Sequence, residues 1–292
     1  MYSKPTRRNT QMVRQNLSSR MRPRSTRPGG SGGCLRLGIA LAVAAFAIIS
    51  YLGAKTINPI TGEEQYITIS RDQEIALGIQ AAPEMANMYG GLEPDADFQA
   101  IVDYVGQRLV ESTIAAESGY PFEFYLLADN QTINAFALPG GQIFITDALF
   151  ARLENEDQLA GVLGHEIGHV LARHGAQRIA QQELSQGLTG AVVLATYDPD
   201  NPSSQRTAQV ALLIGNLVTM KFGREDELES DWLGVCLMAD AGYRPEEMIG
   251  VMKILEAASS GGKLPEFFST HPDPGNRIAQ IQNTITNIAS CP

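Results

Sequence analysis

The pattern of hydrophobic and polar positions begins with a polar stretch, followed by one uninterrupted apolar run at residues 37–53. This run carries no charged residue and is close to the shortest helix that crosses a bilayer. Helical periodicity then predicts helices over 71–88 and 94–117. Ser70 precedes the first of them and belongs to the residue types that cap helix N-termini.

The pattern changes period in the middle of the chain. Residues 122–127 and 142–146 are rich in β-branched and aromatic residues, which favours two strands, and a Pro-Gly-Gly turn lies between them. A helix is predicted next, over 155–175. These elements predict an α+β fold that is predominantly helical, with a small β-sheet beside the helix of 155–175.

Two apolar segments follow, at 187–195 and 208–218, with a polar loop at 197–204 between them. Each apolar segment is too short to cross a bilayer. We expect both to form helices that pack on the core of the domain. The alternative is a hairpin that dips into a membrane.

Charge is distributed unevenly along the chain. Residues 1–36 contain nine Lys or Arg and no acidic residue, whereas the rest of the chain contains 13 basic and 32 acidic residues. The first part is also rich in Ser, Pro and Gly, which predicts a disordered basic tail. Because basic residues that flank a span stay in the cytoplasm, we expect a cytoplasmic N-terminus and an extracytoplasmic or periplasmic domain.

The chain is therefore divided into four predicted regions: a disordered tail at 1–33, a single-pass transmembrane signal anchor at 34–54, a linker at 55–69 and one domain at 70–292. The alternative to the anchor is a signal peptide cleaved near 52–54. We favour the anchor because the apolar run is somewhat long for a signal peptide and the cleavage signal is weak. The tail contains no aromatic residue beyond Tyr2, so we expect no nucleic-acid partner.

The chain contains three cysteines. Cys34 precedes the apolar run and is a poor candidate for lipidation. Cys236 and Cys291 could form a disulfide outside the cytoplasm. The interpretation favoured here leaves them unpaired, with Cys236 buried and Cys291 at a frayed end, because the sequence gives no distance between them.

The strongest chemical signal is the sequence His165-Glu166-Ile167-Gly168-His169, inside the helix predicted for 155–175. Residues four apart lie on one face of a helix, so both imidazoles can reach one metal ion. Glu166 follows the first histidine and can act as a general base on a water beside that metal. The segment predicts one zinc ion per chain, with His165 and His169 as ligands.

A catalytic zinc needs a third protein ligand. Six residues after His169 the chain has Gly175, which excludes a third histidine at that position. His174 lies five residues after His169, which rotates it away from the metal face of a continuous helix. We therefore interpret His174 as structural.

A carboxylate on a second helix is the other source of a ligand. Glu227 and Asp231 are four residues apart, so one can ligate the metal while the other accepts a hydrogen bond from a ligating histidine. Spacing alone does not decide among Glu225, Glu227 and Glu229.

Several segments resemble the gluzincin peptidases of the CAAX prenyl endopeptidase, HtpX and BepA type. In that family the second motif reads Arg-x-x-Glu-x-x-Ala-Asp, with Ser230 here in place of the alanine. The resemblance implies a zincin-type catalytic domain, with Glu227 as the third ligand and Asp231 behind it. The matching segments are Asn58–Gly62, Asn134–Gly141, His165–His174, Arg224–Asp231 and His271–Ile278.

The C-terminal segment contributes two further candidates. His271 and Arg277 are candidate donors to the oxyanion that forms during peptide hydrolysis. The alternatives are that His271 opens the last helix and that Arg277 binds a carboxylate such as Asp231. Resemblance to the BepA-like members adds a third role for His271, as a zinc ligand in a self-inhibited resting state.

An exposed strand edge pairs with an extended peptide through main-chain hydrogen bonds. We expect such peptide binding at the segment that begins with Asn134, Ala135 and Phe136 and turns at Gly140 and Gly141. The alternative is that the asparagine caps a turn and that the glycines only form one. The resemblance implies a zinc metalloendopeptidase that acts on unfolded or misassembled proteins outside the cytoplasm. A metal-containing chaperone-like binding protein is the alternative, against which Glu166 argues because a structural metal has no use for a general base.

Overall fold

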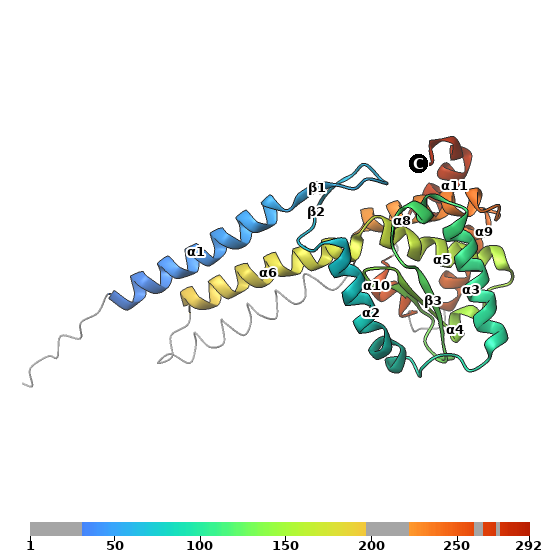
Figure 1. The fold of residues 1–292 in the computed structure, drawn as a ribbon, viewed down its shortest axis with the longest axis horizontal. Coiled ribbons are helices and arrows are strands. Elements are labelled where there is room, and N and C mark those ends of the chain that lie inside the picture. The colour runs from blue at the N-terminus through green and yellow to red at the C-terminus, as the bar shows by residue number, and fades with distance from the viewer. Residues whose placement is uncertain (1–30, 197–221, 260–264, 273–274) are drawn as a thin grey trace, which may run out of the picture.

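The computed structural model describes residues 31–196, 222–259, 265–272 and 275–292. Most of the basic tail and the predicted segments 197–204 and 208–218 lie outside these residues. Figure 1 shows a helical body from which two long helices extend side by side. These are α1 (Ser31–Gly53) and α6 (His174–Thr196), called the two-helix arm below.

A three-stranded sheet lies inside the body. Its strands are β3 (Glu123–Leu127), β5 (Gln142–Thr146) and β4 (Ala135–Ala137), in the order β3-β5-β4. β5 is parallel to β3 and antiparallel to β4, and all its residues are buried, as expected of a central strand. The two strands expected from the sequence are confirmed, and β4 forms an additional edge strand.

The helix expected over 71–88 is confirmed as α2 (Arg71–Met88). Ser70 caps it, because its side chain accepts a hydrogen bond from the amide of Gln73 and the Gln73 side chain bonds the amide of Ser70. The helix expected over 94–117 is divided. α3 (Ala96–Glu111) ends there, and Thr113 caps a separate 3-10 turn, η1 (Ile114–Glu117).

The helix α5 (Glu156–Leu171) passes through the centre of the body and is buried from Gln158 to its last residue. Its crossing partner is α8 (Arg224–Asp240). A Cβ on Gly168 would lie 2.8 Å from the Ser230 carbonyl oxygen, so the glycine allows the two helix backbones to approach. The remaining described helices are α4 (Asp147–Phe150), α9 (Glu247–Ser259), α10 (Phe267–Thr270), α11 (Arg277–Thr286) and η2 (Ile288–Ser290).

The prediction of a single helix over 155–175 is wrong. α5 ends at Leu171, and Arg173 adopts a positive φ of 57°, which redirects the chain into α6 from His174 onward. The expectation that 187–195 packs on the domain core is also wrong. This segment is the outer part of α6 and lies along α1, away from the sheet (Figure 1).

The cysteine interpretation is corrected as well. Cys236 in α8 and Cys291 near the C-terminus form a disulfide, with Cα atoms 5.5 Å apart. The turn η2 brings the chain end back to α8, a proximity that only tertiary structure creates. The bond fixes the C-terminal segment against the helix that carries Glu227.

The arm joins the body through a hairpin of β1 (Lys55–Ile57) and β2 (Glu64–Tyr66). The buried side chains of Asn58 and Gln65 donate hydrogen bonds to the carbonyls of Leu171 and Ala172, at the end of α5. The hairpin therefore satisfies backbone acceptors that the end of a helix leaves without partners.

Candidate metal centre and active site

The helix α5 presents His165 and His169 on one face, four residues apart as the sequence predicts. Their Nε2 atoms are 3.1 Å apart, and both rings are buried. The helix begins with Asn155, whose side chain accepts a hydrogen bond from the Gln158 amide. The buried apolar residues around the motif fix the helix in the core, so the two rings have a rigid base.

The helix α8 brings Glu227 to the two histidines. Its carboxylate oxygens lie 3.5 Å from the Nε2 atoms of His165 and His169. The other two glutamates that spacing left open are elsewhere: Glu225 is exposed, and Glu229 bonds His174. The structure therefore places Glu227, and neither neighbour, in the cluster.

His271 completes the cluster from the segment that follows α10. Its Nδ1 lies 3.1 Å from a Glu227 oxygen and 3.4 Å from the Nε2 of His165. The four ligand atoms lie within 4.8 Å of one another. Ligands about 2.0–2.1 Å from a tetrahedral zinc lie roughly 3.3–3.4 Å apart, so these residues fit such an ion. Three histidines and one carboxylate are also a donor set that suits zinc.

Each α5 histidine is held through its second ring nitrogen. The Nδ1 of His165 lies 2.9 Å from Asp231 Oδ1, as the sequence predicts, and Asp231 in turn accepts hydrogen bonds of 2.7 and 2.5 Å from Arg277. Burial would raise the pKa of Asp231, but the guanidinium of Arg277 outweighs burial and holds it below its usual value. The carboxylate stays ionised and orients the His165 ring.

The sequence missed the corresponding partner of His169. Because α6 starts at His174, this histidine turns back, and the two Nδ1 atoms lie 2.8 Å apart. The Nε2 of His174 lies 3.0 Å from Glu229. His174 is outside the metal cluster, as expected, but it contacts His169, a member of that cluster. His174 is buried between His169 and Glu229 because the helix breaks at Arg173. The local pattern of hydrophobic and polar residues does not predict this break.

Ser230 has a specific contact at the crossing of the helices. Its hydroxyl donates a 2.5 Å hydrogen bond to the carbonyl oxygen of His165. The serine that replaces the alanine of the resembled motif thus joins α8 to the backbone of α5. It occupies the space that Gly168 leaves open.

Glu166 lies beside the cluster and is fully buried. Neither of its carboxylate oxygens has a hydrogen-bond partner among the described residues, and the nearest ionisable contact is His271 Nε2 at 3.6 Å. Burial raises the pKa of this carboxyl group. A buried carboxylate without a partner is costly, which indicates a group kept for a reaction.

The segment that carries His271 lies over the edge of the sheet. The amide of Phe267 donates a 3.2 Å hydrogen bond to the carbonyl of Ile133, next to β4. The Phe267 ring stacks on His271, with ring centres 4.5 Å apart. Phe267 therefore contacts both His271, through its ring, and the sheet edge, through its backbone.

The predicted peptide-binding segment is divided between two places. Asn134, Ala135 and Phe136 are buried at the start of β4, near the His271 segment, so the expectation of an exposed strand edge here is wrong for this structure. Gly140 and Gly141 have positive φ values of 91° and 104° and form a turn. A Cβ on Gly140 would lie 2.5 Å from a backbone atom of α2, so this glycine serves a turn and a close contact.

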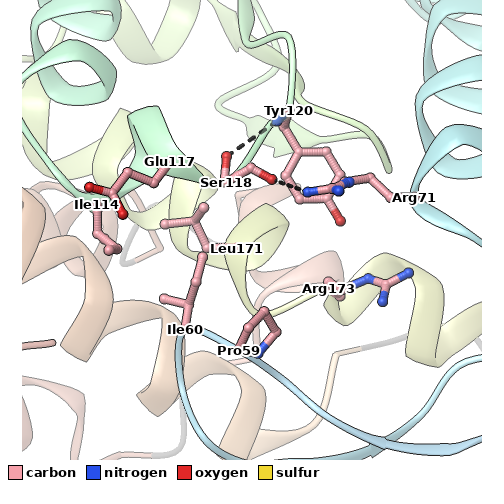
Figure 2. Close-up of a pocket in the computed structure, with 9 residues that line it drawn as sticks. All are labelled: Pro59, Ile60, Arg71, Ile114, Glu117, Ser118, Tyr120, Leu171 and Arg173. Atoms are coloured by element: carbon pink, nitrogen blue, oxygen red, sulfur yellow. Dashed lines mark hydrogen bonds between the residues drawn. The ribbon is translucent and has the colours of Figure 1, made fainter.

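A cavity of about 420 Å³ opens at the C-terminal end of α5, as Figure 2 shows. Leu171 and Arg173 line it together with residues of the hairpin and of the η1 region, and none of the four cluster residues does. Arg173 is paired with the buried carboxylate of Glu74 in α2. The cavity is a separate feature from the metal centre.

Comparison with known proteins agrees with the geometry. A model of peptidase family M48 matches residues 98–285. The chain is 31% identical over 231 residues to the beta-barrel assembly-enhancing protease of Escherichia coli K12. The aligned residues make up 77% of this chain and 46% of that protein. The chain is 31% identical over 230 residues to the mitochondrial metalloendopeptidase OMA1 of Schizosaccharomyces pombe, covering 78% of this chain and 65% of the relative.

The similar protease of Yersinia pestis is 32% identical over 247 residues, which cover 82% of this chain and 50% of the relative. This chain thus spans about half the length of the assembly-enhancing proteases that it matches. The matched region includes all four cluster residues, Glu166, Asp231 and Arg277. The chain belongs to peptidase family M48.

Proposed function

We propose that the protein is a zinc-dependent metalloendopeptidase that hydrolyses peptide bonds of unfolded or misassembled proteins. The observation that carries this proposal is the buried Glu166 carboxylate beside four converging ligand atoms. A metal that only stabilised the fold would leave this carboxylate without a purpose. The names of the relatives, a beta-barrel assembly-enhancing protease and a metalloendopeptidase, support proteolysis, and the first name supports a setting in protein assembly.

His165, His169 and Glu227 would hold the zinc ion. When bound, zinc supplies Lewis acidity, which polarises a carbonyl group and lowers the pKa of a water to about 7. Glu166 takes a proton from the attacking water and passes it to the leaving amine. Its raised pKa suits a group that must accept a proton and then release it. The segment from Asn134 to Phe136 is buried in this structure, so it would align an extended substrate along the edge of β4 only after the His271 segment moves away from that edge.

Glu166→Gln tests the enzyme assignment. The amide keeps the size of the side chain but cannot accept the proton, so caseinolysis should fall by about 100-fold or more while zinc stays bound at one per chain. Zinc content and casein cleavage are measured on the same preparation. Glu225→Gln, at an exposed position of α8, is the control and should retain both. Unchanged cleavage in Glu166→Gln would falsify the proposal.

His271 takes the position that an open catalytic site keeps for water or substrate. We propose that this is a resting state and that the histidine leaves when substrate enters. His271→Ala should therefore raise caseinolysis while zinc is retained by the other three ligands. A fall of 10-fold or more with zinc retained would instead assign His271 to stabilisation of the oxyanion.

The expectation that Arg277 donates to the oxyanion is revised. Its guanidinium is buried and lies against Asp231 on one side and Glu227 on the other, with Nη1 3.1 Å from a Glu227 oxygen. We propose that Arg277 holds these two carboxylates in place. A donor so engaged is not directed at a reacting carbonyl.

The helix α1 is long and apolar enough from Cys34 to Gly53 to cross a membrane. We propose that it anchors the protein, with the N-terminus in the cytoplasm and the catalytic domain outside it. The disulfide supports an oxidising compartment, because such bonds persist outside the reducing cytosol. Cleavage by an added protease in intact spheroplasts checks this orientation: the tail and the embedded helix α1 should be protected, and the catalytic domain should be cleaved.

A further inference from the structure

The outer part of α6 has no role in the metal centre. It contains no charged residue from Leu184 to Thr196, and Leu194 is 43% exposed. An apolar stretch of this length is ordinarily a core helix or a segment that enters a membrane without crossing it. The position of α6 along α1, outside the body, excludes the core helix (Figure 1).

The contact between α6 and α1 uses small residues. A Cβ on Gly187 would lie 2.6 Å from the Cβ of Ala47, so the two helices approach closely at this point. Ala40 and Ala191 are buried on the two helices. Small residues at a close helix crossing are typical of packing within a bilayer, where no hydrophobic effect drives helices together.

Other groups mark where the membrane surface would lie. Tyr51 and Tyr66 stack at the end of α1, with ring centres 4.5 Å apart, and Lys55 pairs with Glu64 just beyond them. Tyrosines favour the membrane–water interface, and an exposed ion pair favours water. Glu183, the last charged residue of α6, lies in the same cavity wall as Ser50 and Tyr51, so the polar boundary falls at one level on both helices.

The depth follows from helix geometry. Ala47 lies six residues inside the end of α1, or about 9 Å. Thr196 lies nine residues beyond Gly187, so the end of α6 lies roughly 23 Å from that boundary, within a hydrocarbon layer of about 30 Å. The chain is back at the metal centre by Phe222, whose ring stacks on His169.

We infer that the outer part of α6, from Gly187 to Thr196, is embedded in the lipid bilayer beside α1. The occupant of its exposed face is lipid acyl chain, because α6 packs beside α1, whose own exposed residues Leu41, Phe46 and Ile49 are apolar. The inference rests on the proposed anchor. The embedded helix α6 then connects the bilayer rigidly to His174, its first residue. His174 in turn contacts the cluster residue His169.

The test uses the full chain with Cys34→Ser, so that the disulfide occupies the other two cysteines. Single cysteines are introduced at Leu194 and Gln186 in α6, at Leu41 in α1 as the membrane reference and at Tyr104 in α3 as the water reference. All four positions are exposed in the folded protein. Each is labelled without reductant with an environment-sensitive fluorophore in vesicles of phosphatidylcholine and phosphatidylglycerol.

The Leu194→Cys probe should be quenched by nitroxides on lipid acyl chains and be several-fold less sensitive to aqueous iodide than the Tyr104→Cys probe. Gln186→Cys, about 12 Å nearer the surface, should respond more to a shallow nitroxide than to a deep one. A water-like probe at Leu194 with a lipid-like probe at Leu41 overturns the inference and leaves the anchor intact. Water-like probes at both positions overturn the anchor as well. Protection from both quenchers at Leu194 means that protein covers this face, which also overturns it.

Discussion

His165 and His169 each direct one ring nitrogen to the metal cluster and bond a buried neighbour through the other. For His165 the neighbour is Asp231, and for His169 it is His174. Burial would lower the pKa of His165, but its contacts with Asp231 and Glu227 outweigh burial and raise it to about 9 without metal. Zinc must therefore compete with a proton at this ring. The fixed orientation of both rings favours zinc binding in this competition.

His174→Ala should weaken zinc binding by about 10- to 100-fold, because partners behind a ligating histidine fix its ring orientation. Competition with a chromophoric chelator measures the affinity. Glu227→Ala removes a ligand and should weaken zinc binding by more than His174→Ala does, while Glu225→Ala should bind as the unchanged protein does. Equal affinity in His174→Ala and the unchanged protein would show that the ring of His169 is held without this contact.

The two helices that carry the ligands meet through their smallest residues. Gly164 faces Gly234, and Gly168 faces Ser230, where a hydroxyl joins the two backbones. Bulkier residues at this crossing would move Glu227 away from the histidines. The register of α8 along α5 is therefore set by packing, and the metal centre depends on that register.

Gly168→Ala should destabilise the fold by about 1–3 kcal/mol, because the added methyl group meets the Ser230 backbone at 2.8 Å. Zinc affinity should fall in parallel. Gly161→Ala, two turns earlier in the same helix, is the matched control, since its nearest contact would be an ordinary 3.4 Å. Urea unfolding of the zinc-free proteins compares the two; equal stability would mean that the crossing relaxes without cost.

At the scale of the molecule, the metal centre is connected to both ends of the chain. The hairpin after α1 bonds the end of α5 through Asn58 and Gln65, and the disulfide fixes the C-terminus to α8. Arg277 in α11 reaches the carboxylates behind the cluster. Segments far apart in sequence thus hold one small site.

Removal of the disulfide by Cys291→Ser should lower the free energy of unfolding by up to about 4 kcal/mol, because the bond closes a loop of 55 residues. The folded mutant should still bind zinc, since neither cysteine belongs to the cluster. Denaturant unfolding with and without reductant checks this. Reductant should destabilise the unchanged protein and leave Cys291→Ser as it was; a shift in the mutant would point to another cause.

The sequence by itself determined the elements whose cause is local. Ser70 caps α2 at the predicted residue because a cap needs only its own turn. His165 and His169 converge because residues four apart on a helix must share a face. The apolar run of α1 follows from composition alone, and the place of Glu227 in the cluster followed from a motif that the chain shares with a family.

Only the tertiary structure decided the features that depend on residues distant in sequence. Spacing could not choose Glu227 over Glu229, since both lie on α8, and the choice depends on how that helix crosses α5. The pairing of Cys236 with Cys291, the contact of His174 with His169 and the position of α6 beside α1 have the same origin. Each is a contact that packing creates between distant segments, and local patterns of hydrophobic and polar residues do not predict such contacts.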